Sequence, residues 1–351
     1  MRTPIGIPRG PAGWATAALA ALFVVCWSSG FVGAKLGAGD APVTTVLMWR
    51  FVPLALLLLP ALVVRGRGAG RAGAGGRALA RDVVIGVLSQ TGYLLSVYGA
   101  IELGVSTGTT ALVDGIQPLA VAALAGPLLG VAVTGRQWAG LAVGLVGVAA
   151  VTWADATAPA GGAPWWGYVV PFAGMLSLVA ATFLERRAPS ATPPLRALAV
   201  HCATSAAVFA GLALATGTAA PPRAASFWVA VAWLVVLSTF GGYGLCWVLL
   251  RRVGVTTVDG LMFLVPAVTT AWGAAMFAEP VTALTVVGLA LALGACALVA
   301  RDDTVRDGGV RGDGVRGDRP GRDRDGLSRR RAAARRPRAA LGRRGPRAAR
   351  R

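Results

Sequence analysis

Charged side chains are rare in the apolar stretches of this chain, and the few that lie there are the first candidates for chemistry. Asp114 lies nine residues into the apolar run 105–129, about 14 Å from its start at the rise of a helix. Arg50 lies in the run 43–64, about 10 Å from the same expected surface. A charge in hydrocarbon costs roughly 2.5–3.5 kcal/mol on insertion scales, so it predicts a function. Asp114 could bind an ammonium group or carry a proton, and a structural Asp114–Arg50 ion pair is the alternative.

Lys35 is the only lysine of the chain and ends the first apolar run, near the expected outer surface. Its long side chain could extend to the lipid headgroups. Contact with the carboxylate of a bound molecule is the other interpretation.

Polar side chains in the middle of apolar runs form a second group of candidates: Gln90, Tyr93, Gln117, Ser238 and Tyr243. Tyr93 and Tyr243 hold equivalent places in an internal repeat, so they could line opposite walls of one cavity. Hydrogen bonding between helices is the alternative, and in membranes it contributes only ~0.6 kcal/mol on average.

Two further titratable residues are candidates with simpler alternatives. Asp259 lies one turn inside the run 255–278, where the helix dipole favours an acid. His201, the only histidine, could relay protons, or it could be a hydrogen-bonded packing residue. We expect no metal and no cofactor, because the sequence has no metal-ligand spacing and no P-loop. It also offers no Ser/His/Asp constellation, so we expect no enzyme.

The elements that carry these residues come in two copies. Gly92-Tyr93, ten residues and Gly104-Val105-Ser106-Thr107 recur as Gly242-Tyr243, ten residues and Gly254-Val255-Thr256-Thr257. Each copy continues through a run that carries Pro118 or Pro266 and a second run that carries Gly140 or Gly288. Two almost wholly apolar copies are typical of a membrane transporter built from internal repeats.

Composition agrees with a membrane protein. Hydrophobic residues make up 55% of the chain and charged residues 14%, against about 25% charged in soluble domains. Apolar runs long enough to cross ~30 Å of hydrocarbon follow one another. We therefore predict an all-α membrane protein with ten spans, at 14–36, 43–64, 82–101, 105–129, 137–153, 165–184, 195–216, 227–250, 255–278 and 281–300.

The arginines of the connections predict the orientation. Alternate connections carry them: Arg2 and Arg9, Arg65 to Arg81, Arg136, Arg186 to Arg196, and Arg251 with Arg252, while the opposite set holds only Arg223. The positive-inside rule then places both termini in the cytoplasm. Five spans in each repeat is an odd number, so the second repeat must be inverted, which favours alternating access over a static pore.

The ends of the chain differ from the apolar part. We expect a cytoplasmic N-terminus over 1–13, the first repeat over 14–153, the second over 165–300 and a disordered tail over 301–351. The tail from 302 holds 17 arginines against 7 aspartates. It could dock to anionic lipid or contact RNA, but a solvated extension is the simpler interpretation, and we expect no nucleic-acid partner.

Several segments are similar to those of one transporter family. Trp27-Ser28-Ser29-Gly30-Phe31-Val32-Gly33-Ala34-Lys35-Leu36, Met48-Trp49-Arg50-Phe51 and the segment from Gly260 to Thr269, followed by Glu279-Pro280, resemble the EamA-type permeases of the drug/metabolite transporter superfamily. The resemblance covers about residues 14–300. It implies two inverted five-helix units, a central cavity lined by both, and outward movement of small metabolites, often amino acids or their relatives.

The sequence departs from this family at three positions. Val131 stands where an acid usually precedes the fifth helix, while Asp114 and Asp259 stand where small or hydroxyl residues are usual. These aspartates could indicate that the substrate differs from that of other family members.

The sequence thus predicts an inner-membrane secondary transporter that exports small polar, amino-acid-like metabolites, coupled to protons. Its partners would be the substrate and the lipid bilayer. The glycines Gly140 and Gly144 permit close helix packing, within the fold or in a homodimer. The first alternative is a non-transporting sensor or assembly module that acts through the basic tail. An intramembrane enzyme is a second, for which the sequence offers no clustered catalytic groups.

Overall fold

The computed structural model describes residues 11–63, 72–130, 133–159, 162–187, 192–297 and 299. The predicted N-terminus and the Arg-rich tail, with its expected disorder, lie outside these ranges apart from residues 11–13. Within them the secondary structure is helical, with no strand. The fold class predicted from the apolar runs is therefore confirmed as an all-helical membrane protein.

The helices follow the predicted spans closely. In the first half they are α1 (Pro11–Ala38), α2 (Val43–Val63), α3 (Ala72–Gly86), η1 (Val87–Gly92), α4 (Tyr93–Glu102), α5 (Thr107–Gly115), α6 (Gln117–Leu129) and α7 (Gly135–Ala156). In the second half they are η2 (Trp165–Tyr168), α8 (Val170–Arg187), α9 (Pro194–Ala215), α10 (Ala225–Trp233), η3 (Leu234–Tyr243), α11 (Gly244–Val253), α12 (Val255–Met262) and α13 (Val265–Phe277).

Nine helical stretches in the described part are long and apolar enough to cross a membrane. A tenth, Ala283–Ala297, is shorter and rises about 22 Å as described. Because a span needs ~30 Å, the count of ten stays a prediction. Large apolar side chains such as Leu56, Trp153 and Leu214 are exposed on the bundle, as expected of surfaces that face lipid.

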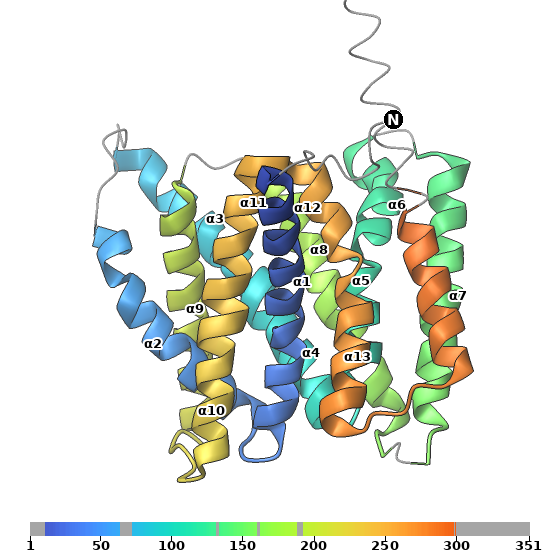
Figure 1. The fold of residues 1–351 in the computed structure, drawn as a ribbon. Coiled ribbons are helices and arrows are strands. Elements are labelled where there is room, and N and C mark those ends of the chain that lie inside the picture. Colours follow the sequence, from blue (N-terminus) through green and yellow to red (C-terminus); the bar gives the residue numbers. More distant parts are fainter. Residues whose placement is uncertain are drawn as a thin grey trace, which may run out of the picture. The chain divides into compact units, whose positions relative to one another are not determined.

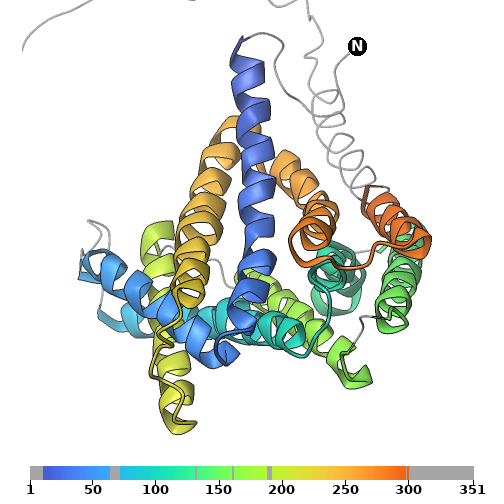
Figure 2. The same cartoon turned by 60° about the horizontal axis from the view of Figure 1, so that its bottom comes forward.

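The helices stand side by side as a bundle, and α1 runs through its middle (Figure 1). From the second view α1 is seen between the α10–α11 rod and α12–α13 (Figure 2), and it packs against η3, α13, α10 and α4. One core of buried side chains, including Phe23, Phe209 and Phe227, joins α1 to α9 and α10. The first helix of the first half is therefore packed mainly against the second half.

The repeated sequence signature marks the same backbone features in both halves. Gly104 has φ 99° and Gly254 has φ 80°, values in the left-handed region that favours glycine. Each glycine begins the connection to the next span. The pair Gly92-Tyr93 lies at the end of the π-helical segment η1, and Tyr243 ends the π-helical segment η3. The repeat is thus a repeat of structure as well as of sequence.

The predicted spans 105–129 and 255–278 are each broken near their middle. The first breaks at Ile116, between α5 and α6, and the second at Phe263 and Leu264, between α12 and α13. In each, a proline follows the break within the first two residues of the new helix, where its missing N–H is tolerated. The two breaks are neighbours, since a Cβ added at Gly115 would lie 2.7 Å from Cγ of Pro266.

Candidate functional site: a cavity lined by both halves

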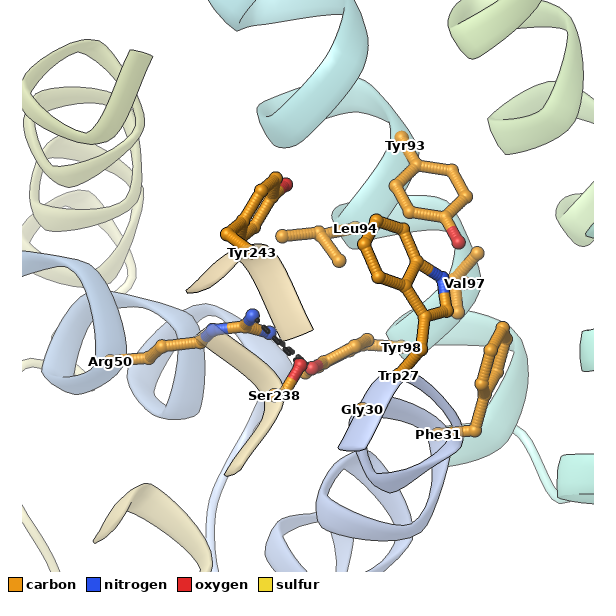
Figure 3. Close-up of a pocket in the computed structure, with 10 residues that line it drawn as sticks. All are labelled: Trp27, Gly30, Phe31, Arg50, Tyr93, Leu94, Val97, Tyr98, Ser238 and Tyr243. Atoms are coloured by element: carbon orange, nitrogen blue, oxygen red, sulfur yellow. Dashed lines mark hydrogen bonds between the residues drawn. The ribbon is translucent and has the colours of Figure 1, made fainter. Parts of the chain in front are cut away.

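A cavity of ≈ 60 Å³ lies in the bundle, with room for several water molecules. Its lining residues are Trp27, Gly30, Phe31, Arg50, Tyr93, Leu94, Val97, Tyr98, Ser238 and Tyr243 (Figure 3). They come from α1, α2 and α4 in the first half and from η3 in the second. Tyr93 and Tyr243, the tyrosines related by the repeat, both line this cavity.

Arg50 is the cation of this cavity, and its side chain is 4% exposed. Its Nη1 donates to the hydroxyl of Tyr98. Its Nη2 donates to Ser238 Oγ and Thr239 Oγ1, both at 3.2 Å. The π-helical segment η3 places Ser238 and Thr239 next to each other and within reach of α2. Arg50 therefore ties the second helix of one half to the irregular helix of the other.

Asp114 lies behind the opposite wall of the cavity. The Tyr93 hydroxyl, at the far side of the close-up from Arg50 (Figure 3), donates to Asp114 Oδ2 at 2.9 Å. The other oxygen, Oδ1, is buried without a hydrogen-bond partner in the part of the chain that is described. Asp114 is the next-to-last residue of α5, so its carboxylate stands beside the helix break. Asp114 does not line the cavity itself, and its hydrogen bond to the lining is the one with Tyr93.

The alternative of a structural Asp114–Arg50 ion pair is wrong. Arg50 bonds to three hydroxyl groups and Asp114 to one, and the ion pairs found among the described residues are Lys35–Glu279 and Arg81–Asp82. The two charged side chains are on opposite sides of one cavity. Their similar expected depths in the membrane therefore did not mean that they are in contact.

Lys35 makes an ion pair with Glu279, with 3.5 Å between Nζ and Oε1. The Glu279 carboxylate also accepts bonds from the backbone N–H of Thr107, at 3.0 and 3.1 Å, and from its hydroxyl, at 2.7 Å. This contact joins α1, the start of α5 and the connection after α13. Lys35 thus has a protein carboxylate as partner, which neither of the two interpretations of the sequence included.

Two more acids hold backbone N–H groups by side-chain bonds. Asp155 Oδ2 accepts from Ser106 N at 3.0 Å, and Glu102 Oε1 accepts from Val43 N at 3.0 Å. Ser106 itself caps α5 by accepting from Thr109 N. Together with Glu279, these acids bond to backbone N–H groups at or just before the starts of α2 and α5.

The remaining candidates do not line the cavity themselves, although the Gln90 side chain bonds to Tyr243 of the lining. Gln117 Nε2 donates to Thr182 Oγ1 at 3.3 Å, a bond between α6 and α8 of the kind expected of inter-helix packing. Gln90 is buried, and its Oε1 has no partner among the residues described. His201 of α9 packs against Gly86 of α3. Asp259 is exposed in the second turn of α12.

Trp27 and Tyr98 line the cavity but were not among the predicted candidates, whereas Ser238 was named for its polarity alone. Tyr98 could have been found, because Tyr93, Leu94, Val97 and Tyr98 recur at the spacing of one helix face. Trp27 and Gly30 lie in the segment that resembles the family pattern of the first helix. Ser238 had no signal beyond its polarity, because its direction depends on the π-helical turn of η3.

Comparison with known proteins assigns the family. The profile of the EamA-like transporter family matches residues 14–153 and again residues 165–301. The chain therefore belongs to the EamA-like transporter family, and it is a multi-pass membrane transporter of the drug/metabolite transporter type.

A solved structure, titled only as the crystal structure of a protein, is 19% identical with a TM-score of 0.55. The match covers 81% of this chain and 96% of that one, and at this identity the likeness concerns the fold. No curated protein sequence matches the chain.

Proposed function

We propose that the chain is a secondary active transporter that exports a small polar, amino-acid-like metabolite by alternating access. The observation that carries this proposal is the cavity to which both halves contribute side chains, with Tyr93 from one and Tyr243 from the other. A site shared by two repeats is typical of transporters in which one repeat rocks against the other. On this proposal the transporter lies in the inner membrane. Its second five-helix unit is inverted, and both termini face the cytoplasm.

The paired irregularities of the spans support movement rather than a fixed pore. Breaks at Ile116 and at Phe263–Leu264 and π-helical turns in η1 and η3 occur in corresponding spans of the two halves. Irregular backbone at membrane depth is tolerated where it is buried in protein or lines a cavity. Such positions allow a span to bend, and on this proposal each half bends at the corresponding place.

Asp114 is the residue that we assign to coupling or to the substrate ammonium. It is a carboxylate beside a helix break, bonded to a tyrosine of the cavity wall and with one oxygen free of partners among the residues described. A proton taken up at this carboxylate would alter its bond with Tyr93. Movement of Tyr93 would then carry the change to the cavity.

The test is substrate counterflow in proteoliposomes, with amino acids, their analogues and polyols as the panel. We expect saturable uptake of one class and its loss in Asp114→Asn, because the amide is isosteric but cannot titrate or hold a full charge. Asp40→Asn, in the connection between α1 and α2, is the matched control and should keep full activity. Normal counterflow by Asp114→Asn would remove this residue from the mechanism, and no counterflow by folded wild-type protein across the panel would contradict the transport of such metabolites.

A further inference from the structure

Arg50 carries a buried positive charge that no acid of the cavity balances. Its side chain is 4% exposed, no carboxylate lines the cavity among the described residues, and the guanidinium contacts only hydroxyl oxygens and the rings of Phe51 and Tyr98. Its Nε has no partner there either. Burying a charge without a counter-charge is expensive, so this site is incomplete without an anion.

The hydroxyl groups around Arg50 point to how an anion would be held. Tyr98 and Ser238 accept bonds from the guanidinium and thus keep their own O–H protons to donate. Neither O–H has an acceptor among the residues that the structure describes, and both side chains line the cavity. Thr239 differs, since its hydroxyl donates to the Leu234 carbonyl at 3.1 Å. Two donors and one positive charge therefore converge on the cavity.

A glycine in α1 leaves space for Ser238 of η3 beside the cavity. A Cβ added at Gly30 would lie 3.0 Å from Ser238 Oγ, so glycine at this position lets η3 approach α1. Most of the rest of the lining is apolar or aromatic: Trp27, Phe31, Leu94, Val97 and the rings of Tyr93 and Tyr243, with the Trp27 and Tyr243 ring centroids 5.6 Å apart. A ligand that fits has an anionic end for Arg50 and an apolar body.

We infer that the cavity binds its ligand as a monocarboxylate, with the carboxylate on Arg50, Tyr98 and Ser238 and an apolar body against Trp27. A single cation lines the described cavity, so one negative charge matches it better than the nearly two charges of a phosphate. This inference rests on the proposed function, because it names the chemical class that the transporter would carry. It makes Arg50 the residue that distinguishes acids from their neutral analogues.

The first experiment measures binding without transport. Purified protein in detergent is unfolded by heat in the presence of butyrate, isovalerate or hexanoate, of the matched amides, and of inorganic phosphate. A ligand that binds the folded state raises the unfolding temperature in a saturable way. We expect at least one acid to do so, with an apparent affinity on the order of ten- to a hundredfold above that of its amide. Phosphate should have no effect.

Two variants assign the effect to Arg50. Arg50→Gln keeps a hydrogen-bond donor without the charge and should lose the preference for the acid, while Arg50→Lys should keep part of it. Arg223→Gln is the matched control, because it removes one arginine from an exposed connection, and it should bind like the wild type. If Arg50→Gln fails to fold, the comparison of acid with amide on the wild-type protein still decides.

Equal stabilisation by acid and amide, no stabilisation by any acid, or undiminished acid binding by Arg50→Gln would overturn the inference. Stronger stabilisation by phosphate would overturn the choice of a carboxylate. The proposed function fails separately: acids that bind in detergent, together with no counterflow by these acids or by the amino-acid and polyol panel, contradict transport and leave the anion site standing. Counterflow without preference for acids contradicts the anion site and leaves transport standing.

Discussion

The Glu279 carboxylate holds three segments together through individual atoms. It pairs with Lys35 of α1 and accepts both the N–H and the hydroxyl of Thr107 at the start of α5. The Glu279 side chain is 9% exposed and that of Lys35 is 27% exposed. The bonds to Thr107 are therefore better shielded from solvent than the ion pair, and they should contribute more to stability.

We expect Glu279→Gln to lower the free energy of unfolding by about 1–3 kcal/mol, because it weakens the charge-assisted bonds to Thr107 and removes the ion pair. Lys35→Met should cost less. The coupling energy between the two changes should be about 1 kcal/mol or below, as for other partly exposed pairs. A double-mutant cycle on the unfolding of the purified protein measures it, and a larger loss in Lys35→Met than in Glu279→Gln would contradict this ranking.

Sequence reasoning named several residues of the cavity and its surroundings, but not their hydrogen-bond partners, and the Asp114–Arg50 pair that it offered as an alternative does not form. The charges of Asp114 and Arg50 were evident in apolar runs, and the repeat predicted that Tyr93 and Tyr243 share a cavity. Depth along a span is readable from residue number, whereas the direction of a side chain around the helix is not. For this reason the bonds of Arg50 to Tyr98 and of Asp114 to Tyr93 were not foreseen.

At the scale of elements, two spans touch through glycines. Helix α7 of the first half lies beside helix Ala283–Ala297 of the second (Figures 1 and 2). A Cβ added at Gly288 would lie 2.6 Å from the Gly147 carbonyl oxygen. Gly140 and Gly144 also face side chains of this chain. The close packing expected of these glycines occurs within the fold, and the homodimer stays a prediction.

Gly288→Ala should lower the unfolding temperature, because the added methyl group would force the two backbones apart; overpacking of this kind costs about 1–3 kcal/mol. Gly294→Ala on the same helix is the matched control. A Cβ there meets no atom within 4 Å, so this change should be neutral or stabilise the helix by up to about 1 kcal/mol. Thermal unfolding of both variants makes the comparison, and equal unfolding temperatures would contradict the close contact.

The spans themselves could be predicted, but their interruptions only in part. Apolar length predicted where helices lie, because a span must cover the hydrocarbon with satisfied backbone bonds. Pro118 and Pro266 marked the two breaks without fixing their geometry. The π-helical segments η1 and η3 had no signal in residue type, since they depend on how α1, α8 and α9 pack against them.

At the scale of the whole molecule, the cavity and the helices that match the family lie before residue 302. Removal of 302–351 should therefore leave counterflow within about twofold of the wild type per molecule, since a sequence so rich in arginine and poor in large apolar residues is not expected to contribute to a packed core. Counterflow normalised to reconstituted protein measures this. Loss of transport by the truncated chain, still folded, would favour the alternative in which the basic tail carries the function.

Lys35 is the only lysine in the sequence, and it lies in the contact that ties α1 to α5 and to the segment after α13. Besides the terminal amine, it is thus the one primary amine that acylating reagents can modify. We expect acylation of Lys35 to be slower while Glu279 holds its amine and faster when that contact opens. A rise in the acylation rate of Lys35 would then report the opening of this contact at one end of the bundle, without any engineered label.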